Sequence, residues 1–184
     1  MKKISTVTLV VTKTLEILHW LTALVAAALA VCCGVAGDWL KGILESGVAE
    51  YGRSLKTNGL EFVVADANGT VNMTGVMLFA IGAVLVLGLM AMVFRNIYLV
   101  VKKSKTDSPF CEDNIRMIKE IGIFSIAVPV VSLIMSIIAK LVVGVDVIDT
   151  SVGLDSFVMG IVVLCLTQFF AHGAKLEKDV DGLV

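Results

Sequence analysis

The sequence contains little charge for its length. Asp, Glu, Lys and Arg make up 17% of its 184 residues, whereas a typical soluble domain carries about 25%. Hydrophobic residues reach 58%, above the roughly 45–50% of soluble domains. This apolar excess is too large for a globular core, so the composition is typical of a membrane protein.

Motifs of the common enzyme classes are also missing. The sequence has no P-loop, no glycine-rich dinucleotide turn, no G-x-S-x-G and no H-E-x-x-H motif. Its two histidines, His19 and His172, lack the nearby ligands of a metal site, and its four cysteines form no C-x-x-C pair. We therefore expect a protein that is not an enzyme and binds no cofactor and no metal.

The sequence does contain four apolar blocks. They predict helices at about residues 14–36, 75–101, 121–143 and 154–172, because a helix needs about 20 apolar residues to cross a bilayer. A soluble bundle would require a polar stripe on each helix, and the two middle blocks have none. The predicted fold class is an all-α transmembrane four-helix bundle.

The first block could also be a cleaved signal peptide, since the chain starts with the basic residues of MKK. However, Lys13, Glu16 and His19 come late for the basic region of such a peptide, and no A-x-A cleavage site precedes a mature domain. We expect the block to be a retained helix.

The distribution of Lys and Arg predicts the orientation. With the N-terminus inside, eleven of the fifteen bases lie on the cytoplasmic side, and Lys41, Arg53, Lys56 and Lys140 lie outside. An excess of Lys and Arg marks the cytoplasmic side of membrane proteins. The sequence therefore predicts a multi-pass protein of the bacterial cytoplasmic membrane with both termini in the cytoplasm.

The polar stretch SPFCEDNIRMIKEIG, residues 108–122, covers most of the predicted cytoplasmic loop, residues 102–120, and the start of the third helix. Asp107 or Ser108 can accept hydrogen bonds from the first free N–H groups of a helix, with Pro109 at its first position. Phe110 is expected to dip towards the membrane and to anchor the start of the helix. The segment is either a docking surface for a cytoplasmic partner or a solvated connector.

The loop and the C-terminal end carry a resemblance. The PF…N…I…IG pattern before the third helix and the G-x-x-L-x-x-D-x-D pattern after the last resemble the bacterial domain-of-unknown-function family 2975. The matching positions are Pro109, Phe110, Asn114, Ile118, Gly122, Gly173, Leu176, Asp179 and Asp181. The resemblance implies a four-helix membrane protein, often encoded beside a small helix-turn-helix regulator, with no known reaction or catalytic residues.

Residues 37–74 predict a small extracytoplasmic cap. Trp39, Leu40, Ile43, Leu44 and Val48 recur at helical spacing, with Trp39 at the level of the headgroups. The following LEFVVADANGTVNM offers a short β-hairpin that turns at Asp66, Asn68 and Gly69. The cap either covers the bundle or receives a ligand or peptide.

Ionisable and polar groups in the apolar blocks are costly and mark possible sites. These intramembrane residues are Glu16, His19, Arg95, Lys140, Asp155 and Gln168. We predict a Glu16–Arg95 pair on the inner side and a Lys140–Asp155 pair on the outer side, with Asp146 and Asp149 as rivals for Lys140. Alternatively, Arg95 and Lys140 extend to the headgroups. Gln168 is expected to face another helix.

Two features concern how the helices pack. Small residues in the first helix, namely Ala23, Ala26, Ala27, Ala30 and Gly34, permit close approach of another helix of the chain or of a second copy. Pro129 is expected to kink the third helix.

Two functions remain open at this stage. The first is a non-enzymatic sensor or interaction protein that binds the lipid bilayer and a cytoplasmic partner, such as a transcription regulator, without itself binding nucleic acid. Its partner-binding residues would be Phe110, Asn114, Arg116, Lys119, Lys175 and Asp179. The alternative is a small transporter or channel subunit, which would need the intramembrane polar groups to converge.

Overall fold

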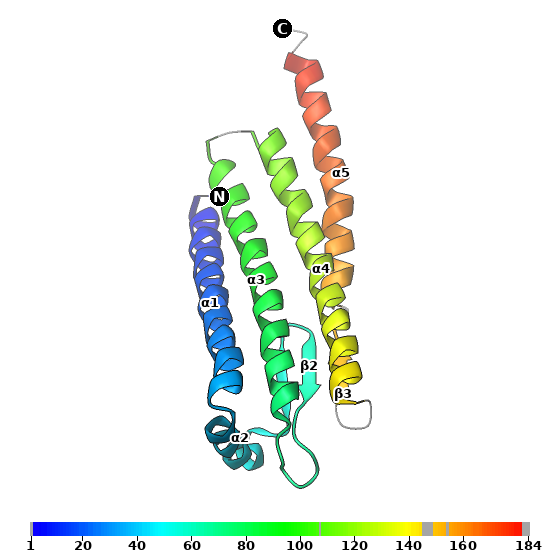
Figure 1. Cartoon of the computed structure of the whole chain (residues 1–184). Coiled ribbons are helices and arrows are strands. Elements are labelled where there is room, and N and C mark those ends of the chain that lie inside the picture. The colour runs from blue at the N-terminus through cyan, green and yellow to red at the C-terminus, as the bar shows by residue number, and fades with distance from the viewer. Residues whose placement is uncertain (1, 107, 145–148, 154, 182–184) are drawn as a thin grey trace. The chain divides into compact units, whose positions relative to one another are not determined.

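The structure is a computed structural model that describes residues 2–106, 108–144, 149–153 and 155–181 (Figure 1). In these residues the chain forms five helices and three short strands. Their order is α1 (Lys2–Val35), α2 (Gly37–Tyr51), β1 (Ser54–Thr57), β2 (Leu60–Val63), α3 (Met73–Lys103), α4 (Glu112–Val143), β3 (Asp149–Val152) and α5 (Asp155–Asp181).

Four of the helices are long and apolar enough to cross a membrane. The candidate spans are Thr6–Val35, Met73–Lys103, Glu112–Val143 and Asp155–Asp179. Each exceeds the roughly 20 residues that a bilayer requires. The prediction of four such helices is confirmed.

The helices are longer than the apolar blocks predict. α1 begins at Lys2 instead of near residue 14, and α5 continues to Asp181 instead of ending near residue 172. α4 begins at Glu112, so the predicted loop 102–120 is shortened. Hydrophobicity marks the part of a helix that suits lipid, but backbone hydrogen bonding continues into polar residues.

The chain divides into two compact units. Unit 1 comprises Met1–His19, Leu89–Ala127 and Asp155–Val184, and unit 2 comprises Trp20–Gly88 and Val128–Leu154. Unit 1 contains the α3–α4 connection and the end of α5. Unit 2 contains α2 and the three strands.

The predicted cap is part of unit 2, and it begins with α2. Figure 1 shows α2 lying across the end of α1. Leu40 is buried, and Leu44 and Val48 pack against the hydrophobic core, whereas Trp39 and Ile43 are exposed. One side of α2 thus packs on the rest of unit 2. The exposed Trp39, on the other side, suits a position among headgroups.

The cap contains a β-hairpin, but it is not the predicted one. β1 pairs with β2 in antiparallel register around Asn58 and Gly59, whose φ angles of 36° and 85° are left-handed. Asn-Gly is the preferred two-residue hairpin turn because both positions require positive φ. The pairing predicted across Asp66–Gly69 is reduced to one bridge, Ala65–Val71.

The third strand comes from the connection between α4 and α5. β3 pairs antiparallel with β2, with Leu60 opposite Val152 and Val63 opposite Asp149, so the sheet order is β1-β2-β3. The chain is therefore not all-α, and the turn between α4 and α5 includes a strand. Residues 145–148 of that turn lie outside the described part.

The core of unit 2 lies between the sheet and α3. Leu60 and Phe62 of β2 are almost completely buried, and the rings of Phe62 and Phe79 meet edge to face at 5.8 Å. A Cβ at Gly82 would lie 2.9 Å from Leu60 Cδ2, so the missing side chain lets β2 pack directly on α3.

In unit 1, α4 and α5 cross at two glycines. A Cβ at Gly160 would lie 2.6 Å from Ile126 Cγ1 and 2.9 Å from the carbonyl oxygen of Gly122. A Cβ at Gly122 would lie 2.7 Å from Leu164 Cγ. Real Cβ atoms do not approach other heavy atoms so closely, so this crossing depends on both glycines.

The predicted small-residue face of α1 is partly covered within unit 2. Ala23 is buried and Ala26 packs against the core, whereas a Cβ at Gly34 would meet nothing within 4 Å. Pro129 is buried inside α4, which runs continuously past it. Large apolar side chains of α1, such as Leu24 and Val31, remain more than 60% exposed, as expected for a helix that faces lipid or a second copy.

Candidate functional site

The α3–α4 connection and the end of α5 form one surface of unit 1, which we call the loop–tail face. It comprises residues 104–106 and 108–120 together with residues 170–179 of α5. Polar contacts join its parts: Ser108 Oγ donates to Glu177 at 2.8 Å, and the ammonium group of Lys178 lies 3.0 Å from the Glu112 carboxylate. Loop and tail therefore present their side chains together.

A tight turn comes immediately before α4. Cys111 N–H donates to the carbonyl oxygen of Ser108 at 3.1 Å, and Phe110 N–H donates to Ser108 Oγ at 3.2 Å. Pro109 is the second residue of this turn, where its fixed φ is favoured. The prediction that Pro109 is the first helical residue is therefore wrong, and Asp107 lies outside the described residues.

Phe110 fastens the turn to α5. Its ring lies 5.7 Å from the ring of Phe170, and a Cβ at Gly173 would come within 2.8 Å of Phe110 Cε1. The side chain is 36% exposed. Phe110 therefore packs on the neighbouring helix, and its position towards the membrane stays a prediction.

Asn114 organises the connection from inside. Its side chain is fully buried, and its amide nitrogen lies 3.1 Å from Ser104 Oγ and 3.4 Å from the carbonyl oxygen of Pro109. Its Oδ1 has no hydrogen-bond partner among the described residues. Because it is buried, Asn114 positions the loop and does not present its side chain to a partner.

The other predicted partner-binding residues are on the outside of the loop–tail face. Arg116, Lys119, Lys175 and Asp179 are all exposed. Arg116 makes a loose ion pair with Glu120, at 3.8 Å. The structure thus brings the predicted residues to one unit and separates a buried positioning residue from charged exposed ones.

The intramembrane polar residues of α1 have local partners. Glu16 is buried and pairs with Lys13 at 3.0 Å, so the predicted Glu16–Arg95 pair is replaced by a contact within one helix. Lys13 lies one turn before Glu16 in the same helix, so it can neutralise the carboxylate without a contact to a second helix. His19 Nδ1 lies 2.8 Å from the carbonyl oxygen of Leu15, and its ring lies 5.0 Å from that of Phe94.

In α5 the predicted polar residue is Gln168. Gln168 is exposed, whereas the adjacent Thr167 is buried and donates to the carbonyl oxygen of Val163 at 2.9 Å. In the described part of the chain Thr167 takes the buried side and Gln168 does not, because neighbouring helical residues point about 100° apart. That Gln168 faces another helix, such as one of a second copy, stays a prediction.

The predicted outer pair concerns the end of α4 and the start of α5. Lys140 is partly buried in the last turn of α4 and Asp155 is exposed in the first turn of α5. Their pairing stays a prediction. Of the rivals for Lys140, Asp146 and the side chain of Asp149 lie outside the described part.

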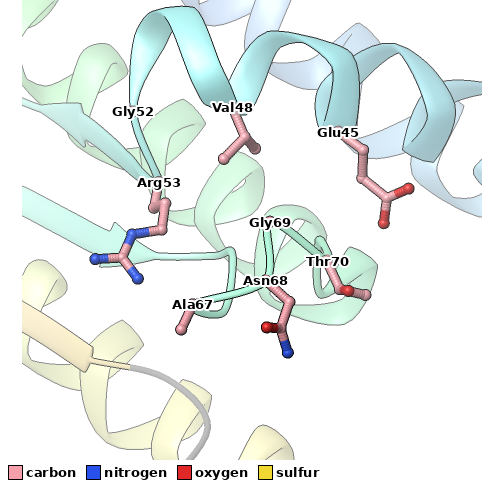
Figure 2. A pocket seen from close by; sticks show the side chains of 8 residues that line it. All are labelled: Glu45, Val48, Gly52, Arg53, Ala67, Asn68, Gly69 and Thr70. Atoms are coloured by element: carbon pink, nitrogen blue, oxygen red, sulfur yellow. The ribbon is translucent and has the colours of Figure 1, made fainter.

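The cap of unit 2 contains a hollow of about 620 Å³ that sequence reasoning did not locate. Figure 2 shows Val48 and Gly69 between Glu45 on one side and Arg53 on the other, with the two charged groups pointing apart. The Glu45 carboxylate is also engaged, since it accepts from the N–H of Val71 at 3.1 Å. The charged groups therefore do not converge on one point, and the hollow has no evident ligand chemistry.

No protein-family model, no curated protein and no solved structure matches this chain. The resemblance to family 2975 consequently stays a prediction.

Proposed function

We propose that the chain is a multi-pass protein of the bacterial cytoplasmic membrane that binds a cytoplasmic protein through its loop–tail face. The supporting observation is the construction of that face. Buried Asn114 and the Phe110 contact hold the connection in place, while Lys119, Lys175 and Asp179 are exposed beside it. A solvated connector would not require a fully buried polar residue or an aromatic contact to the last helix.

The proposed partner is a helix-turn-helix regulator, which the family resemblance implies and which would be encoded beside this chain. No enzymatic step is proposed. The transporter alternative needs polar groups that meet in the membrane, but Glu16 is paired with Lys13 and Gln168 is exposed. These positions favour the interaction protein.

The orientation can be tested by labelling introduced cysteines. Lys105 and Asn68 are exposed, whereas Ser104 Oγ is the hydrogen-bond acceptor of Asn114 and is better left intact. In a chain whose native cysteines are replaced by serine, an impermeant maleimide should label Asn68→Cys on intact spheroplasts. Lys105→Cys should react only after permeabilisation. Labelling of Lys105→Cys from outside, with Asn68→Cys protected, would reverse the proposed topology.

The partner can be tested by capture on the full-length chain in nanodiscs, with the neighbouring regulator as the probe. Lys119→Glu with Lys175→Glu should weaken capture about tenfold or more, because each base near an anionic surface contributes about 1 kcal/mol and the replacement adds repulsion. Arg53→Glu in the cap is the matched charge control and should leave capture unchanged. Equal capture by the double variant, or no capture by the unmodified chain, would refute the proposed docking.

A further inference from the structure

A groove runs between α3 and α4 within unit 1. It consists of two adjoining cavities of about 450 Å³ and 260 Å³, which share Leu99, Arg116 and Met117 in their walls. Because the cavities share these side chains, they form one continuous depression, which we call the α3–α4 groove.

The groove is positively charged. Four bases line it, Arg95, Lys102, Lys103 and Arg116, together with the acids Asp113 and Glu120, so its net charge is +2. Both acids are engaged: Asp113 pairs with Lys103, and Glu120 accepts from Asn96 at 3.0 Å and faces Arg116 at 3.8 Å. In the described part of the chain no carboxylate pairs with Arg95 or Lys102. Two positive charges are thus left for an incoming anion.

The groove also has an apolar part. Met92 and Phe124 line the cavity that contains Arg95 and Arg116, whereas Lys102 and Lys103 line the other cavity at the end of α3. Met92 precedes Lys102 by ten helical positions, or about 15 Å along the helix. The walls therefore change from charged to apolar over the length of a short acyl segment.

We propose that the α3–α4 groove binds an anionic phospholipid. The phosphate would be held by Arg95, Arg116 and Lys102. A guanidinium group can donate two parallel hydrogen bonds to two phosphate oxygens. Acyl carbons would lie along Met92 and Phe124. Basic pockets between membrane helices on the cytoplasmic side are suited to anionic headgroups, and a free phosphate would leave the apolar wall unused.

The inference rests on the membrane placement in the proposed function but not on the protein partner. The test uses the full chain in a neutral detergent without any partner, and native mass spectrometry measures lipid retention. Phosphatidylglycerol should bind about tenfold more tightly than phosphatidylcholine with the same chains. Glycerol 3-phosphate should not compete at equal concentration.

Arg95→Gln with Arg116→Gln should remove the preference for phosphatidylglycerol, and Arg53→Gln in the cap should keep it. Lys102→Gln is a second test that still applies if the double variant does not fold, because Lys102 is exposed. It should weaken the preference for phosphatidylglycerol. Phe124→Ala should lower affinity for long-chain more than for short-chain phosphatidylglycerol. Equal binding of both lipids, equal competition by glycerol 3-phosphate, or an equal loss in Arg53→Gln would overturn the proposal. None of these outcomes depends on whether the loop–tail face captures a regulator.

Discussion

Replacing Gly160 by alanine should separate α4 from α5 and destabilise the protein by about 1–3 kcal/mol, the usual cost of overpacking. The new Cβ would lie 2.9 Å from the carbonyl oxygen of Gly122 and 3.0 Å from the backbone nitrogen of Ile126. Backbone atoms cannot rotate away as a side chain can. The helices must therefore move apart, which also disturbs the contact of Phe110 with Phe170.

Gly88→Ala is the matched control for this substitution. Gly88 lies inside α3, and a Cβ there would meet nothing within 4 Å. Because alanine has the higher helix propensity, the substitution should stabilise the protein by up to about 1 kcal/mol. Thermal unfolding in detergent measures both variants, and proteolysis of residues 104–111 measures the loop. If Gly160→Ala is as stable as Gly88→Ala, the close crossing of α4 and α5 is incorrect.

Phe62→Ala should unfold the cap while leaving the helices in the membrane. Phe62 is completely buried and its ring meets Phe79, and removal of a buried phenylalanine typically costs about 3–5 kcal/mol. Phe62 is the largest fully buried side chain of the described residues and lies in the sheet, so most of this loss falls on the cap. Limited proteolysis should therefore cut between residues 52 and 72 much faster than in the unmodified chain.

The control for Phe62→Ala is Glu61→Ala on the opposite face of the same strand. Lys56 and Ser151 donate hydrogen bonds to Glu61 and lower the pKa of its carboxyl group. An exposed ion pair of this kind contributes little, so cleavage should stay close to that of the unmodified chain. Equal cleavage of the two variants would show that Phe62 does not hold the cap together.

The sequence predicts the helices well because their signal is local. Whether a block is apolar and long enough to cross a bilayer depends on its own residues and not on the segments packed beside it. The sequence prediction places the hairpin one turn too late, although the Asn58–Gly59 pair is the stronger turn signal. Asp66 and Gly69 do form a turn, but in the described residues the strands on its two sides pair through a single bridge, Ala65–Val71.

The site was predictable only in part. The loop and the tail were both identified, yet the burial of Asn114 and the packing of Phe110 on Gly173 depend on how α4 meets α5. Hydrophobic patterns do not specify such a crossing. Sequence reasoning does not find the α3–α4 groove, because the predicted Glu16–Arg95 pair uses the charge of Arg95, whereas in the structure Glu16 pairs with Lys13.

The pairing of β2 with β3 constrains how the protein can be made. Glu61 and Ser151, which share a hydrogen bond in this sheet, are 90 positions apart, and both α3 and α4 lie between them. At about 5–20 residues per second, the ribosome must add several seconds of chain before β3 exists. Until then β2 has an open edge, and such an edge can pair with a strand of another chain. A chain that fails to bring the α4–α5 connection beside β2 would keep that edge exposed, so the completed sheet is a late sign that the chain has assembled correctly.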